Sequence, residues 1–207
     1  MNTKVKNILD RISALEEELK DELREQERHA LYELKGGKVL FEKKIREAHR
    51  RMRMGILSWI RTSRPQNVVS APIIYMIVIP LIFLDVSMTI YQMICFRLYG
   101  IPAVKRSDYI TLDRHRLNYL NLLEKINCDY CSYANGLFAY VTEIGARTEQ
   151  YWCPIKHARK NLIVHKRYPY FIDYGDAKNL HSRFEELRVS LNHSIEKEEE
   201  KKSSRKA

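Results

Sequence analysis

The chain has 207 residues, of which 45% are hydrophobic and 30% charged, and its formal net charge is +10. A chain of this length suits one or two compact units, and the positive charge suits an acidic partner. Nucleic acid is disfavoured as that partner, because no recognition motif accompanies the charge. The sequence also contains no phosphate-binding glycine loop, nucleophile elbow or metalloprotease helix, which argues against the enzyme classes that these motifs define.

Residues 1–35 predict an amphipathic helix with some coiled-coil character. Its apolar residues, spaced three and four positions apart, are Ile8, Ile12, Leu15 and Leu19. The stripe weakens after Leu23, before it completes the three to four heptads that a coiled coil usually needs. The helix therefore either packs on the rest of the chain or forms a homo-oligomer through residues 5–23. We expect no cleavable signal peptide, because no uninterrupted apolar stretch follows the first lysines.

Residues 38–66 predict a basic helix that lies on a membrane surface. Nine Lys and Arg stand against two Asp and Glu in residues 36–66. Apolar residues alternate with these cations, which is typical of a helix in the headgroup plane, although an amphipathic helix of a soluble domain has the same pattern. An anionic lipid membrane is the expected partner, at about 1 kcal/mol per nearby Lys or Arg. The side chains expected at the interface are Arg50, Arg51, Arg53, Trp59, Arg61, Arg64 and, beyond the next segment, Arg97.

Residues 68–96 form a near-unbroken apolar run with a single charge. About 20 apolar residues suffice for a helix to cross a hydrocarbon core of about 30 Å, and this run would be about 43 Å long as a helix. Two full crossings would need about 40 residues. The alternatives are one tilted or kinked span and a re-entrant hairpin with a break near Pro80. Basic residues flank both ends, and only the hairpin keeps both flanks in the cytoplasm. A buried helix of a soluble core is the third interpretation.

The single charge in that run is Asp85. A carboxylate at membrane depth costs about 2.5–3.5 kcal/mol, so ionisable residues there usually have a function. The structural alternative is a carboxyl that packs near the break and pairs with Ser87 or Thr89 on a neighbouring turn. The sequence shows no second charge within the run that would suggest a proton pathway.

Residues 101–191 predict a cytoplasmic helical domain that binds a metal. One helix, capped by Asp108, Thr111 or Asp113, should end at Cys128. A second helix, from about residue 133 to 149, should return the chain to Cys153. The expected ligands are Cys128, Cys131, Cys153 and His157, spaced as C-x2-C and C-x3-H. Three thiolates and one imidazole suit structural zinc, with iron or an iron–sulfur cluster as the alternative. Unligated thiols or a disulfide are the remaining interpretation, and a cytoplasmic location disfavours the disulfide.

Other features of this region are less specific. His165, Asp173 and Tyr174 are the candidates for catalysis, if there is any, although a lone histidine and a turn with capping aspartates explain them as well. The aromatic and basic residues between 156 and 176 suit a membrane interface better than single-stranded nucleic acid, given the membrane segment. Residues 192–207 form a charged tail that we expect to be a frayed helix end or disordered.

Together these features predict a mainly α-helical, membrane-anchored protein with amphipathic N-terminal helices, one hydrophobic membrane segment and a small helical Cys3His module. We expect an accessory or scaffold protein that recruits protein partners at the cytoplasmic face of a cytoplasmic or inner membrane, rather than an enzyme. A membrane-bound metalloenzyme or iron–sulfur redox protein acting on lipid or quinone is the alternative. A membrane-tethered RNA-binding zinc module ranks third.

Overall fold

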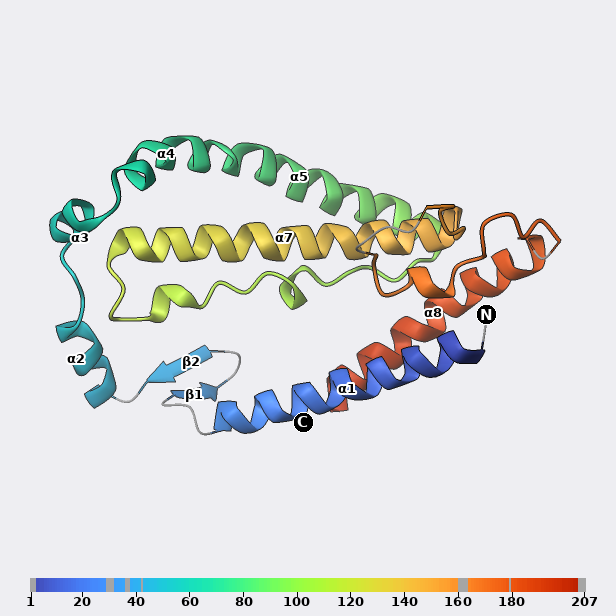
Figure 1. The fold of residues 1–207 in the computed structure, drawn as a ribbon, viewed down its shortest axis with the longest axis horizontal. Coiled ribbons are helices and arrows are strands. Elements are labelled where there is room, and N and C mark those ends of the chain that lie inside the picture. Colours follow the sequence, from blue (N-terminus) through green and yellow to red (C-terminus); the bar gives the residue numbers. More distant parts are fainter. Residues whose placement is uncertain are drawn as a thin grey trace. The chain divides into compact units, whose positions relative to one another are not determined.

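The structure is a computed structural model that describes residues 3–28, 32–35, 38–41, 43–159, 164–178 and 180–204. It is mainly helical, as predicted (Figure 1). The chain divides into two compact units: residues 1–63 with 113–129, and residues 64–112 with 130–207. Each unit is described separately.

The first unit begins with α1 (Thr3–Arg28), a helix inside the predicted range of residues 1–35, whereas residues 32–35 form a strand instead. An antiparallel hairpin follows, made of β1 (Tyr32–Lys35) and β2 (Lys38–Phe41), with Lys35 opposite Lys38. The sequence between the strands is Gly-Gly, a two-residue hairpin signal. The basic stretch then forms α2 (Lys43–Arg51) and α3 (Ile56–Thr62). This corrects the prediction of one basic helix from residue 38, because the strand pairing and the extended backbone of Gly55 interrupt it.

The second unit contains the predicted apolar segment as a nearly continuous helix. It consists of α4 (Pro65–Met76), α5 (Val78–Tyr91), the π-helical turn η1 (Gln92–Phe96) and α6 (Arg97–Tyr99). We call Pro65–Tyr99 the apolar helix; it has 35 residues and ends at Gly100, whose positive φ of 65° is typical of a helix stop. Within the residues that the structure describes, it is the one helix long and apolar enough to cross a membrane.

The apolar helix does not turn back on itself. Its interruption lies at Ile77, three residues before Pro80, and Ile77 keeps right-handed helical angles (φ −66°, ψ −17°). The proline ring conflicts with the carbonyl four residues earlier, which accounts for the break, while its place in the first turn of α5 spares it a lost hydrogen bond. α4 and α5 therefore run on in one direction (Figure 1), and the re-entrant hairpin is not formed.

The helix α7 (Leu122–Trp152) is a single helix of 31 residues. This corrects the prediction of two helices with a break after Cys128. No Gly or Pro stands between residues 126 and 133 to interrupt it. The helix begins at a capping box, in which the Glu124 amide donates to the Asn121 side chain (3.0 Å) and the Asn121 amide donates to the Glu124 carboxylate (2.8 Å). The residues before it, where a helix was expected, contain only the 3₁₀ turns η2 (Arg106–Asp108) and η3 (Arg114–Arg116) among the described elements.

After α7, an irregular segment contains the turn η4 (Tyr168–Tyr170) and an isolated bridge between Ile155 and Ile172. The last helix is α8 (Leu180–Ser204). It extends well past residue 192, where we expected a frayed or disordered tail. The Glu and Lys residues of the tail are good helix formers, and Ile195 is buried in the core, which stabilises this extension.

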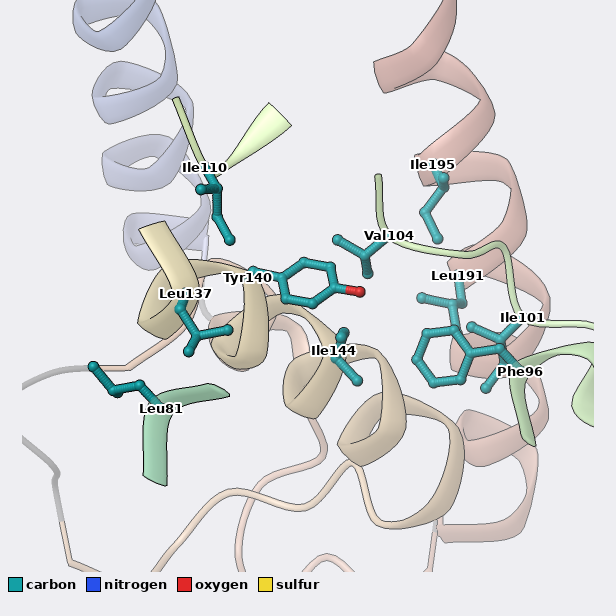
Figure 2. Close-up of a cluster of buried hydrophobic side chains, with 10 residues drawn as sticks. All are labelled: Leu81, Phe96, Ile101, Val104, Ile110, Leu137, Tyr140, Ile144, Leu191 and Ile195. Atoms are coloured by element: carbon teal, nitrogen blue, oxygen red, sulfur yellow. The ribbon is translucent and has the colours of Figure 1, made fainter. Parts of the chain in front are cut away.

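The core of the second unit is centred on α7 (Figure 2). Figure 2 shows Tyr140 pointing between Val104 and Ile144, with Phe96 close to the side chains of α8. The buried cluster comprises Leu81, Phe96, Ile101, Val104, Ile110, Leu137, Tyr140, Ile144, Leu191 and Ile195. It thus ties the apolar helix, the segment 101–110 and α8 to one helix.

Gly136 allows the segment 101–110 to approach α7 closely. A Cβ at this position would lie 2.6 Å from the Tyr109 carbonyl oxygen and 3.0 Å from the Ile110 Cα atom, both of which are backbone atoms. Only glycine fits at such a close backbone contact without a shift.

Candidate functional site

The predicted metal ligands are not brought together. Cys128 and Cys131 lie near the start of α7, whereas Cys153 follows its last residue. At 1.5 Å per residue, the helix separates Cys153 from the other two cysteines by more than about 30 Å, whereas ligands of one zinc ion lie within about 4 Å of each other. The structure therefore does not show the predicted Cys3His site, which depended on a turn between two helices.

The fourth predicted ligand has other contacts. The His157 ring stacks on Tyr168 at 6.0 Å between centroids, and the His157 amide donates to the Tyr168 hydroxyl at 2.7 Å. All four cysteines are free thiols. In the described part of the chain, no group of three or more His, Cys, Asp or Glu side chains is placed to hold a metal ion.

The three catalytic candidates have separate environments. His165 Nε2 lies 2.9 Å from a Glu149 carboxylate oxygen, and its ring packs on aromatic residues. Asp173 accepts a hydrogen bond from Lys156 Nζ at 2.7 Å, which lowers the pKa of this carboxyl. Tyr174 is exposed. Among the described residues, His165 and Asp173 have different partners, and no hydrogen bond or ion pair links one of the three to another.

The most distinctive polar site lies on the apolar helix itself. Asp85 is buried, and Arg106 from the following segment donates to its carboxylate through two guanidinium nitrogens. Arg106 Nε lies 3.1 and 3.2 Å from the two carboxylate oxygens, and Nη2 lies 2.7 Å from Oδ2. The Tyr133 hydroxyl of α7 donates to the same carboxylate at 2.9 Å. Burial, then the hydrogen bond to Asp85, raises the pKa of Tyr133, so its hydroxyl keeps its proton.

Two more polar side chains continue this site along the same face of the helix. Asp85, Thr89 and Gln92, which we call the polar ladder, are spaced by four and three residues, so they point the same way. Thr89 Oγ1 lies 3.4 Å from the Tyr140 hydroxyl, which also accepts a hydrogen bond from Gln92 Nε2. The Gln92 side chain pairs with the Val104 backbone as a strand would, through bonds of 2.9 and 3.3 Å.

The polar ladder fixes the segment after the apolar helix to its inner face. Each contact joins residues distant in sequence, and every ladder member has at least one hydrogen-bond partner inside the unit. Burying polar groups in this way is tolerated because they are paired. The sequence pointed to Asp85, but its partner Arg106 was only one of several flanking cations, and no local pattern identifies it.

A second ionic cluster links α7 to the irregular segment. Glu143 accepts hydrogen bonds from Arg147 Nε and Arg167 Nη2, each at 2.8 Å, and Arg147 Nη1 donates to the Pro102 carbonyl at 2.6 Å. Burial opposes the ionisation of Glu143, yet the charges and hydrogen bonds of the two arginines outweigh it and lower the pKa of this carboxyl. The cluster therefore stays ionised at neutral pH.

A shallow apolar groove of about 340 Å³ lies between α5 and α7. The Tyr91 hydroxyl lies 3.1 Å from Thr148 Oγ1 across it. The lining residues are Met88, Tyr91, Gly145, Thr148, Glu149 and Trp152. The groove brings no charged pair or nucleophile to a point where a reaction could be assigned.

The opposite face of the apolar helix is exposed and apolar. Its most exposed side chains retain between 67% and 76% of their accessible surface, and such large continuous apolar patches mark interaction sites. We call this surface the outer face: Val69, Ile73, Met76, Ile79, Phe83 and Leu98. Arg64, the N-cap residue of α4, and Arg97, the first residue of α6, are exposed near its two ends.

The other residues expected at a membrane interface lie on α2, α3 and the turn between them. Arg50, Arg51, Arg53 and Arg61 are exposed, and Trp59 is half-buried. Their exposure is compatible with contact to lipid headgroups.

Comparison of the chain with protein-family models, with curated proteins and with solved structures gives no match.

Proposed function

We propose that this protein is a membrane-anchored accessory protein that recruits a partner at the membrane surface. The observation that carries the proposal is the exposure of the apolar helix. Only 11% of its most apolar stretch is buried within the fold. A core helix of a soluble protein would cover that surface. The proposal does not depend on a metal site.

The partner-binding element in this proposal is α1. The side chains of its predicted apolar stripe are exposed, with 57% of the surface accessible at Ile8 and 60% at Leu19. The described residues of the first unit therefore leave the stripe uncovered. An amphipathic helix of another protein fits such a stripe, since anchors at three- and four-residue spacing are what helix pairing uses. Recruitment through α1 and anchoring through the apolar helix use different parts of the chain.

Membrane extraction tests the anchor. The full chain should stay with membranes after washes with high salt and with alkaline carbonate, and should be released by detergent. Replacing Met76, Ile79 and Phe83 together with serine should release it into the salt wash, because the outer face loses its apolar surface. The matched control replaces Leu112, Phe138 and Val189, which are also exposed, and should leave it bound. Release of the unmodified protein by salt alone would contradict the anchor.

Site-specific photo-crosslinking in intact membranes tests recruitment. A photoreactive side chain at Leu15, in the stripe, should give a discrete protein adduct, and the same group at Asp10, on the other side of α1, should not. Leu19→Asp should abolish the Leu15 adduct, because a charge in the stripe opposes helix pairing. Equal adducts at both positions, or an adduct that persists in Leu19→Asp, would contradict a role for the stripe.

A further inference from the structure

The outer face and the charges behind it define how the apolar helix meets a membrane. We propose that the apolar helix lies within one leaflet, parallel to the membrane plane, with its outer face among the acyl chains and both of its ends on the same side. The inference rests on the proposed membrane anchor and deepens it, because it replaces a crossing with a one-sided attachment.

Length is the first argument. The apolar run of residues 68–96 is about 43 Å long as a helix, against a hydrocarbon core of about 30 Å. A straight crossing would need a tilt of about 45°, which lies outside the usual range of about 0–40° for membrane spans. The structure offers no hairpin that would shorten the run, because α4 and α5 continue in one direction through Ile77.

The second argument is the segment held against the middle of the helix. Asp85 lies about 21 Å along the helix axis from its end at Tyr99. Arg106 is bound there, with 47% of its side-chain surface exposed, and the neighbouring Lys105 and Asp108 are exposed as well. A crossing helix would carry these charged side chains into the hydrocarbon, where ionisable groups are strongly disfavoured.

An in-plane helix avoids this cost. The polar ladder and the segment bound to it lie on the inner face, whereas the outer face consists of large apolar side chains, with Arg64 and Arg97 near its two ends. A one-sided apolar surface of this kind sinks about 5–10 Å into the boundary between headgroups and acyl chains. The two arginines at its ends then lie at headgroup level, where anionic lipid complements their charge. One leaflet of an anionic bilayer is therefore the partner that fits this surface.

Depth-dependent fluorescence quenching tests the geometry. The full chain, with its four cysteines replaced by serine, is labelled with an NBD fluorophore at Val69→Cys, Phe83→Cys or Leu98→Cys and bound to anionic vesicles that contain lipids brominated at graded depths. These positions are about equally exposed, at 76%, 74% and 75%, and lie near the start, the middle and the end of the helix. Ser107→Cys, beside Arg106, is the fourth position.

An in-plane helix predicts the same depth and the same fractional loss of emission at the three outer-face positions, with no quenching by lipid at Ser107→Cys. A maximum depth at Phe83→Cys with shallow ends, together with quenching at Ser107→Cys, would overturn the inference in favour of a span while leaving the anchor intact. A second copy covering the outer face would give no quenching and a dimer in detergent, which also overturns it. Failure of the labelled chains to float with vesicles at all would instead contradict the proposed anchor.

Discussion

Replacing Arg106 alone should destabilise the second unit more than replacing its partner Asp85. The Asp85 side chain keeps only 12% of its surface exposed, whereas Arg106 keeps 47%. Arg106→Met therefore leaves a buried carboxylate with only neutral donors such as the Tyr133 hydroxyl, while Asp85→Asn leaves a guanidinium that water can reach. Removing one member of a buried pair costs about 3–5 kcal/mol, and the half-exposed arginine places this pair at the lower limit, about 3 kcal/mol. For Asp85→Asn we expect about 1 kcal/mol, the net value of one hydrogen bond.

The double variant separates charge from shape. Asp85→Leu combined with Arg106→Met removes both charged groups, so no buried group is left unpaired, and stability should return to within about 1 kcal/mol of the unmodified protein. The assay is guanidinium unfolding in non-ionic detergent micelles, followed by tryptophan fluorescence and circular dichroism, with the coupling taken from the double-mutant cycle. Equal losses in the two single variants, or additive losses in the double variant, would refute the reasoning.

Two further predictions concern α7. The pKa of Glu143 is lowered from 4.5 in the folded state, so its ion pairs should stabilise the fold above about pH 4.5 and lose that effect as the pH falls through the folded pKa. Glu143→Gln should therefore flatten this part of a profile of unfolding free energy against pH. The control Glu186→Gln, at an exposed ion pair, should leave the profile unchanged. Gly136→Ala should cost about 1–3 kcal/mol in thermal unfolding, because its Cβ would meet the Tyr109 backbone. Gly145→Ala, where a Cβ has nothing described within 4 Å, should instead be neutral or stabilise by up to about 1 kcal/mol, and the reverse order would show that the close approach at Gly136 is unimportant.

The local elements of the chain could be predicted wherever one property dominates a long window. The period of apolar residues in 1–35 specifies α1, and the hydropathy of 68–96 specifies the apolar helix with an interruption close to Pro80. Both depend on residues near in sequence, since helix formation and transfer from water are set by the composition and spacing of one segment. The hairpin at 32–41 was missed although its Gly-Gly sequence is a known turn signal.

The structure does not show the candidate metal site, because that prediction depended on where a helix ends. C-x2-C and C-x3-H spacings suit a ligand set only if the chain turns between them, and the uninterrupted α7 keeps Cys131 and Cys153 apart. The start of that helix was also misplaced, because Asp108 and Asp113 looked like caps while the pair of Asn121 and Glu124 forms the capping box. Several residues of this chain can cap a helix, and tertiary packing selects among them.

By itself, the sequence determined that a long apolar helix exists, that cations flank it and that one carboxylate interrupts it. Only the tertiary structure decided that this carboxylate pairs with Arg106, that Gln92 binds the Val104 backbone, and that the helix therefore has a polar inner face and an apolar outer face. The physical reason is that these contacts join residues far apart along the chain, so their energy depends on the distance between groups in space. Periodicity and composition contain no such distances.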